Sequence, residues 1–218
     1  MILKSYLNGL SLGSGVYLLG RCLDMTLSAD SYLRLMSIKG ELLDKGLQLC
    51  RKNLLVVGPV VFTVVDIFLI NHTLFFSFRD MGDILIIHSI GYYFAHRTMH
   101  ENSIMKRIHI FHHKFDQLLI PSIGNAVSVE EFCFAYMLPF IVGALLVRPG
   151  SLSFINAVGM ISIANLFIHC KELEHIKLME LFVSPKKHIN HHKTYNRHYS
   201  APILDLEYLF AMDQKRTP

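Results

Sequence analysis

Histidine is the residue whose number and spacing stand out in this chain of 218 amino acids. The sequence holds 13 histidines, as many as its glycines and almost twice its 7 prolines. Burying an imidazole costs free energy unless it hydrogen-bonds or binds a metal ion, and neutral imidazole is a common metal ligand. So many histidines in an apolar chain suggest a metal cofactor.

Eight of the histidines fall into three short clusters. The clusters are His96 and His100, then His109, His112 and His113, then His188, His191 and His192. The first has the spacing His-x-x-x-His, and the other two share the pattern His-x-x-His-His. Residues three and four apart lie on one face of a helix, so we expect each cluster to present its imidazoles in one direction. Eight imidazoles exceed what one metal ion can use, which favours two ions.

The ligand type does not identify the metal, because imidazole suits iron, zinc, copper and nickel alike. Few carboxylates lie near the clusters, which argues against a carboxylate-bridged centre built on Glu-x-x-His motifs. A single His-x-x-x-His pair is more often an ordinary surface or core feature. Three clusters, two of them with identical spacing, favour metal binding instead.

The composition indicates a membrane protein. The chain is 52% hydrophobic and 17% charged, whereas a soluble domain carries about 25% charged residues. The four cysteines are scattered without a Cys-x-x-Cys pair, so they predict neither a zinc–thiolate site nor a disulfide framework. The net charge of +4 is modest and its basic residues lie between apolar runs. It therefore favours membrane topology over nucleic-acid binding.

We expect an all-α integral membrane fold with about four transmembrane helices in two hairpins and a histidine-rich helical cap. The four apolar runs are residues 54–70, 83–96, 132–147 and 152–169. A span needs about 20 apolar residues, with a range of about 17–25. Arg148-Pro149-Gly150 supplies the turn of the second hairpin. We expect residues 1–53 to form amphipathic helices on the membrane surface. We expect residues 54–218 to form the catalytic domain.

The distribution of charge predicts the orientation. Both hairpins would deliver the histidine-rich segments 96–117 and 170–198 to the same face, and these segments hold many lysines and arginines. The two opposite turns carry only Arg79 and Arg148. The positive-inside rule then places the histidine clusters in the cytosol.

The segments HRTMHENSIMKRIHIFHHKF and HINHHKTYN, separated by an apolar hairpin, resemble the two halves of the signature of the fatty acid hydroxylase and sterol desaturase superfamily. The resemblance covers about residues 54–212. It implies a di-iron centre that activates O2 and hydroxylates or desaturates a C–H bond of a sterol or fatty acyl lipid. It also implies a cytochrome b-type or ferredoxin-type electron donor. Zinc could replace iron in purified protein.

The resemblance assigns the eight clustered histidines as metal ligands and catalytic residues. It adds His169 as a ninth ligand, since a ligand normally follows the second hairpin, and leaves His175 as a poorly spaced tenth candidate. The membrane would be the endoplasmic reticulum of a eukaryote or the inner membrane of a bacterium. The sequence after the last cluster departs from the family pattern: Asn196-Arg197-His198 lacks the usual glycine, and residues 209–212 replace the usual Phe-Gly-Thr.

Other polar residues leave alternatives open. His88 lies within a predicted span, where it either serves the functional site or hydrogen-bonds a neighbouring helix, with Asp66 as a possible partner. His198 is expected to support a ligand rather than to be one. Asn165 and Asn190 could orient ligands. Six acidic residues could also support ligands, although a solvated loop role is favoured for each: Asp116, Glu130, Glu131, Glu172, Glu174 and Asp205.

Three other functions compete with lipid hydroxylation. A desaturase would use the same fold. A histidine-rich metal transporter would carry ionisable residues deep within several spans, whereas most histidines here lie outside the apolar runs. A non-catalytic family member would not be expected to keep all the ligand motifs.

Overall fold

The computed structural model describes residues 1–73, 75–116 and 118–214, and the side chains as far as residue 211. The described residues form helices and contain no β-strand, only two isolated bridges. The prediction of an all-α fold is therefore confirmed.

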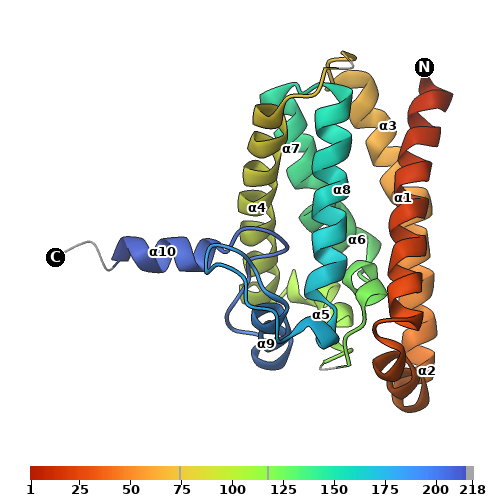
Figure 1. The fold of residues 1–218 in the computed structure, drawn as a ribbon, viewed down its shortest axis with the longest axis vertical. Helices are drawn as coiled ribbons and strands as arrows, with labels where there is room; N and C mark the ends of the chain where they lie inside the picture. The colour runs from red at the N-terminus through yellow and green to blue at the C-terminus, as the bar shows by residue number, and fades with distance from the viewer. Residues whose placement is uncertain (74, 117, 215–218) are drawn as a thin grey trace.

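Five rods of helix run roughly parallel and make up the body of the molecule (Figure 1). The first rod is α1 (Ile2–Met25), and the second consists of α2 (Ala29–Lys52), a π-helical turn (Asn53–Val57) and α3 (Gly58–Phe68). The third is α4 (Phe78–Glu101). The fourth consists of α6 (Val129–Glu131), a second π-helical turn (Phe132–Met137) and α7 (Leu138–Val147), and the fifth is α8 (Ser151–Ile168).

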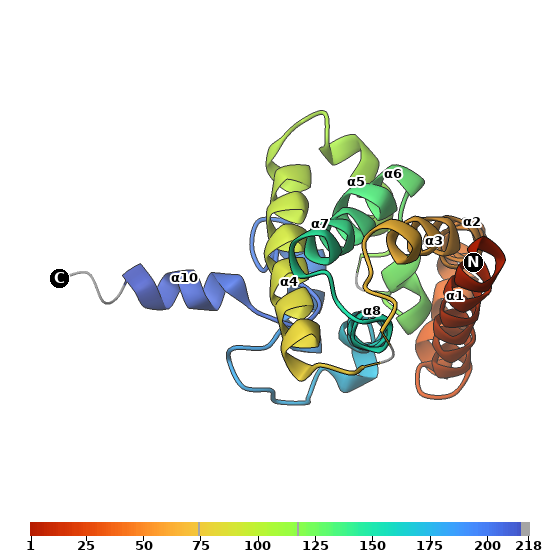
Figure 2. The same cartoon turned by 90° about the horizontal axis from the view of Figure 1, so that it is seen from above.

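The two predicted hairpins are α3 with α4, and α7 with α8. Their turns lie side by side at one end of the molecule, where the Asn71 amide donates to the Pro149 carbonyl at 2.9 Å and Asn71 bridges to Gly150. The chain therefore returns twice to the opposite end. That end holds α5 (Lys106–His113) and α9 (Pro185–Thr194), while α10 (Leu206–Gln214) projects sideways (Figures 1 and 2).

Two helical stretches are long and apolar enough to cross a membrane, Val129–Val147 and Ser151–Ile168. The four-span topology stays a prediction. The outer faces of α3 and α4 are nevertheless apolar, with exposed side chains at helical spacing: Val56, Val60, Val64 and Phe68, then Ile86, Ile90 and Phe94. Exposed apolar stripes of this length are typical of a surface that meets lipid or another protein.

The N-terminal helix α1 packs along α3 and contributes to the interior. Its buried positions include Gly9, Gly13 and Val16, and Val16 belongs to the core cluster that also contains Tyr92 and Phe132. The placement of residues 1–53 on a membrane surface, and a domain boundary at residue 53, stay predictions.

The close approach of α1 to the second rod yields a test. A Cβ atom at Gly13 would overlap the backbone carbonyl of Leu54, whereas a Cβ at Gly15 would meet nothing within 4 Å. We expect Gly13→Ala to lower the melting temperature of the purified protein by several degrees, because the helices must separate. Gly15→Ala, the matched control, should leave it unchanged or raise it slightly, since alanine favours the helix by about 0.5–1 kcal/mol. Equal melting temperatures for the two variants would contradict this packing.

Candidate metal centre

Nine histidines meet at the end of the molecule opposite the hairpin turns. The last turns of α4 hold His96 and His100, and α5 holds His109, His112 and His113. His169 follows the last residue of α8, and α9 holds His188, His191 and His192. Helix α9 starts at a defined residue because the Ser184 hydroxyl accepts from the Lys187 amide and Pro185 occupies the first turn. These are the nine histidines predicted from the sequence as ligands, and that role is a proposal.

The nine imidazoles form two separate groups. We call His96, His100, His109, His113 and His191 the five-histidine group, and His112, His169, His188 and His192 the four-histidine group. In each group the nitrogen atoms that could bind a metal all lie within 4.8 Å of one another. All nine side chains are buried except that of His100, which is partly exposed.

The division corrects the expectation that each cluster points in one direction. His109 and His113 belong to one group while His112 belongs to the other, and His191 likewise parts from His188 and His192. The reason is helical geometry. Adjacent residues are rotated by about 100° around the helix axis. The second and third histidines of a His-x-x-His-His motif therefore lie on opposite sides of the first. The i,i+4 pair stays together in both motifs.

The Nε2 atoms within the five-histidine group are very close together. Five Nε2–Nε2 distances among His96, His100, His109 and His113 lie between 2.8 and 3.2 Å. In the four-histidine group, His169 Nε2 lies 2.9 Å from His188 Nε2 and 3.3 Å from His112 Nε2. Such distances require either a shared proton or a shared cation.

The hydrogen bonds of Nδ1, the second nitrogen of the ring, show whether Nε2 carries a proton. His96 Nδ1 donates to the Tyr199 carbonyl at 2.7 Å and His191 Nδ1 donates to the Arg197 carbonyl at 2.8 Å. His169 Nδ1 donates to the Asn165 carbonyl at 2.7 Å. A carbonyl can only accept, so in each neutral ring the proton is on Nδ1 and Nε2 carries a lone pair.

The geometry fits metal ions. Lone pairs that face one another at 3 Å repel unless a cation lies between them. Two imidazole nitrogens bound to one ion at about 2.1 Å are about 3.0 Å apart at a right angle and about 3.4 Å apart at the tetrahedral angle. The observed spacings of 2.8–3.3 Å lie at or within 0.2 Å of this range, and each group offers enough nitrogens for one ion.

A buried carboxylate supports the five-histidine group. His109 Nδ1 donates to Glu131 Oε1 at 2.7 Å, and both side chains are almost fully buried. Hydrogen bonds of this kind orient a ligating imidazole and raise its basicity. The favoured solvated role of Glu131 is therefore wrong. Glu131 lies 22 positions from His109 at the start of an apolar helix, so no local spacing could have revealed the contact.

Among the described residues, the side chains of the other five acidic candidates form no hydrogen bond to the nine imidazoles. Glu130 is exposed and Asp116 pairs with Lys39. Glu172 accepts from Ser28 and Ser31, and partly buried Glu174 has no hydrogen bond to a clustered ring. Asp205 is buried and ion-paired with Lys187, so a solvated role is wrong for it too.

The remaining histidines and amides lie apart from the groups or act through the backbone. His175 is exposed, and the His198 ring lies beside Glu207. The suggested partnership of His88 with Asp66 is wrong, because Asp66 accepts from Ser5. Asn165 orients His169 through its backbone carbonyl, and the Asn190 side chain accepts from Arg197.

Burial holds these imidazoles neutral. Desolvation lowers the pKa of His112, His188 and His192 well below 6.5, and neighbouring imidazoles lower it further. Desolvation also lowers the pKa of His169 to about 4 and that of His191 to about 3. A neutral imidazole is the form that binds metal, so the groups are ready to ligate at neutral pH.

The lowered pKa values predict acid sensitivity of the metal-free protein. The unfolded chain takes up protons near pH 6.5, whereas the folded chain does not, so stability falls as the pH drops below 6.5. Each histidine held neutral costs about 2 kcal/mol at pH 5. We expect the melting temperature of chelator-treated protein to fall steeply between pH 7 and pH 5. A flat profile over that interval would contradict the buried, neutral state of the rings.

The Glu131 contact predicts a loss of metal affinity. Replacing a partner of a ligating histidine typically lowers affinity by 10- to 100-fold. We expect Glu131→Gln to weaken Zn²⁺ binding, used as the probe metal, by about tenfold. The measurement is competition with a chelator of known affinity. Glu130→Gln, an exposed neighbour, is the matched control and should bind Zn²⁺ as the wild type does. Similar affinity in both variants would remove Glu131 from the site.

Comparison with known proteins identifies the family. Residues 83–211 match the family model described as "Fatty acid hydroxylase", a segment that contains all nine histidines. A search of curated proteins found no match, and neither did a search of solved structures. The match covers more than half of the chain, and it confirms the resemblance drawn from the histidine motifs. The chain belongs to the fatty acid hydroxylase family.

Proposed function

We propose that this protein hydroxylates or desaturates a C–H bond of a sterol or fatty acyl lipid, using O2, external electrons and two iron ions. Family membership and the histidine groups indicate a membrane oxidoreductase of the di-iron hydroxylase and desaturase type. The proposal adds the identity of the metal, the nine ligands and the class of lipid.

The observation that carries the proposal is the convergence of imidazole lone pairs. Backbone carbonyls hold the protons of His96, His191 and His169 on Nδ1, so that Nε2 of each ring faces its group. A structural histidine would use both nitrogens in hydrogen bonds. These nitrogens instead surround two points, each of which suits one cation. All nine histidines are therefore proposed as ligands.

Within this proposal the chain performs positioning and the metal pair supplies oxidation. Bound iron would provide the capacity to reduce O2 and to oxidise an unactivated C–H bond. Glu131 and the three backbone carbonyls orient the imidazoles. The buried surroundings exclude water, which strengthens every electrostatic interaction at the site and protects it from side reactions.

An opening beside the five-histidine group gives a route for electrons. This cleft is lined by three histidines and Tyr195, and by three lysines and one carboxylate that pairs with Lys39: His100, His109, His113, Tyr195, Lys39, Lys106, Lys114 and Asp116. The lysines favour an acidic protein as partner. This charge supports a cytochrome b-type or ferredoxin-type electron donor.

The proposed placement is a multi-pass protein of the endoplasmic reticulum or of a bacterial inner membrane, with the histidines in the cytosol. Two apolar helices and the family support a membrane location. The apolar outer faces of α3 and α4 support two further spans. The basic residues around the histidines support the cytosolic side.

A metal transporter is the alternative from another class. It would distribute ligands along a path through the membrane. In the described part of the chain, the nine grouped histidines lie at one end, and the helical interior holds only His88. The geometry therefore favours a fixed metal centre. An intact set of nine histidines likewise disfavours a non-catalytic member.

The decisive experiment compares cellular lipids with and without the protein. We expect a hydroxylated or unsaturated lipid to accumulate with the wild type and to be absent with His112→Ala, because the four-histidine group loses a ligand. His175→Ala changes an exposed histidine and serves as the matched control with normal product. Metal analysis of iron-loaded protein should give two ions per chain. Equal product from His112→Ala would refute catalysis, and no more than one ion per chain would refute the dimetal centre.

A further inference from the structure

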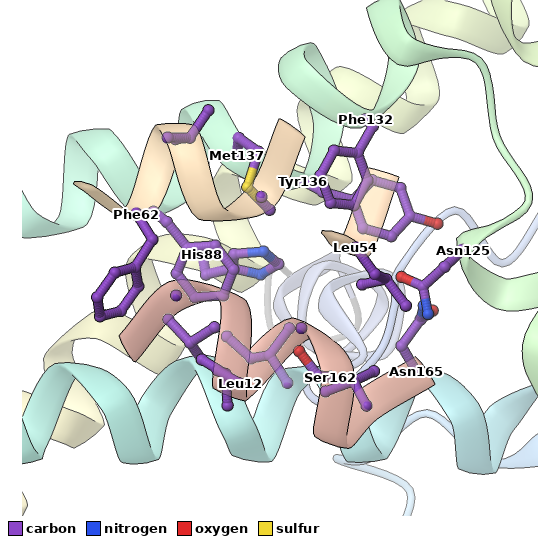
Figure 3. Close-up of a pocket in the computed structure, with 18 of the residues that line it drawn as sticks. Leu12, Leu54, Phe62, His88, Asn125, Phe132, Tyr136, Met137, Ser162 and Asn165 are labelled. Carbon is purple, nitrogen blue, oxygen red and sulfur yellow. The ribbon is translucent and has the colours of Figure 1, made fainter. Parts of the chain in front are cut away.

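An apolar cavity lies inside the helical body, next to the histidine groups. Side chains from α1, the second rod, α4, α7 with its π-helical turn, and α8 surround it (Figure 3). Its volume is about 70 Å³. Ligand pockets typically have about 300–1,000 Å³, so the cavity suits a single slender apolar chain and not a bulky lipid.

The cavity is elongated along the helices. Its lining on α8 extends from Phe154 to Asn165, eleven residues, which corresponds to about 16 Å of helix at 1.5 Å per residue. The Asn165 end is next to the metal centre, because Asn165 accepts from His169. Tyr92, another lining residue, lies against His96 with ring centroids 5.2 Å apart. The far end is lined by phenylalanines and aliphatic side chains.

His88 interrupts this apolar wall. Its side chain is 1% exposed, and neither ring nitrogen has a hydrogen-bond partner among the described residues. A backbone group of Tyr136 lies near the ring without forming a hydrogen bond of ordinary geometry. The Phe140 ring packs against the imidazole with centroids 4.3 Å apart. Figure 3 shows His88 toward one end of the labelled side chains, with Asn125 and Asn165 at the other.

An orphaned imidazole in an apolar cavity needs a partner from outside the chain. A buried polar group without a hydrogen bond costs about 1–3 kcal/mol. Ordered water would need two to four polar partners. The Phe140 ring that packs against the imidazole offers none, and the backbone group of Tyr136 offers one. A ligand that fills the apolar space and carries one polar group would satisfy both needs.

Building on the proposed function, we propose that His88 binds a neutral hydroxyl group of a lipid whose apolar body fills this cavity. Neutral imidazole has one donor and one acceptor, and a hydroxyl group can serve either. A carboxylate is disfavoured, because an unpaired charge is costly to bury among apolar side chains. The cavity thus selects an apolar lipid with an uncharged oxygen.

Helix α4 sets the distance between His88 and the histidine groups. His88 and His96 are eight residues apart on α4, which corresponds to about 12 Å along the axis. A lipid held by its hydroxyl group at His88 would therefore present to the metal centre a carbon about 12 Å away from that group. His88 would act as the determinant of which carbon is oxidised, without touching the reacting atoms.

Binding of three probes of equal chain length tests the proposal without turnover. The probes are dodecan-1-ol, dodecane and dodecanoate, and the measurement is the melting temperature of wild-type protein in nanodiscs as each probe is titrated. We expect dodecan-1-ol to stabilise the wild type at the lowest concentration. His88→Phe should weaken the binding of dodecan-1-ol by roughly tenfold and leave the binding of dodecane unchanged. His88→Gln should retain most of the preference for dodecan-1-ol over dodecane. Cholesterol, added as a fourth probe, distinguishes a ring-bearing alcohol from a chain alcohol.

The control is His72→Phe, the same substitution at an exposed histidine by the hairpin turns. It should bind every probe as the wild type does. His88→Phe is expected to fold, because it removes an unpartnered polar group and keeps an aromatic ring. If dodecan-1-ol stabilises no better than dodecane, or equally in wild type and His88→Phe, the proposal is overturned. Because binding is measured directly, loss of this preference is distinguishable from failure of the oxygenase activity.

Discussion

The mutual repulsion of imidazole lone pairs is the constraint around which this molecule is organised. Nine histidines are held so that their free nitrogens face two points, and Nδ1–H donors to Tyr199, Arg197 and Asn165 prevent several rings from turning away. Without cations this arrangement is unfavourable, and burial adds to its cost. Under the proposed function, metal binding would therefore contribute to the stability of the folded chain as well as to its chemistry. The protein must also hold the ligands rigidly enough that they do not relax apart.

The helical hairpins meet that requirement by returning the chain to one end of the molecule. Backbone hydrogen bonds between residues 71–73 and 149–151 tie the two turns together. At the histidine end, Asp24 of α1 accepts from the Ser122 backbone and hydroxyl and pairs with Arg21, which fixes the loop that carries Gly124. Any Cβ at Gly124 would lie 2.8 Å from His169 Nδ1. The N-terminal helix thus contributes to the metal centre although it supplies no ligand.

The sequence predicted which histidines come together better than it predicted their surroundings. Side-chain type and spacing identified eight of the nine histidines that the structure brings together, since i,i+3 and i,i+4 neighbours on a helix are a local property, and the family resemblance added His169. The division into five and four depends on the 100° rotation between His112 and His113 and on which partner helix each faces. The Glu131 contact of His109 and the Tyr199 carbonyl acceptor of His96 arise from tertiary packing across 22 and 103 positions. The helical rods were likewise predicted in part, but the 11-residue α3 extends α2 through a π-helical turn, which no apolar run reveals.

The proposed metal site lies within one segment of this chain, whereas the cavity draws on that segment and on the residues before it. The matched segment, residues 83–211, supplies every histidine of the two groups and Glu131. The cavity is instead shared with residues before that segment, among them Gly9, Leu12, Leu54 and Phe62 from α1 and the second rod. Changes at the cavity-lining positions of α1 or α3, away from Asp24, can therefore alter the shape of the cavity while leaving the arrangement of the histidines intact. His88 lies in the matched segment, on the helix that also carries His96, so the single helix α4 sets the distance from this part of the cavity wall to the histidine groups. If the proposed function holds, a bundle built in this way could change its lipid without changing its oxidant, because the cavity wall and the nine histidines share no residue.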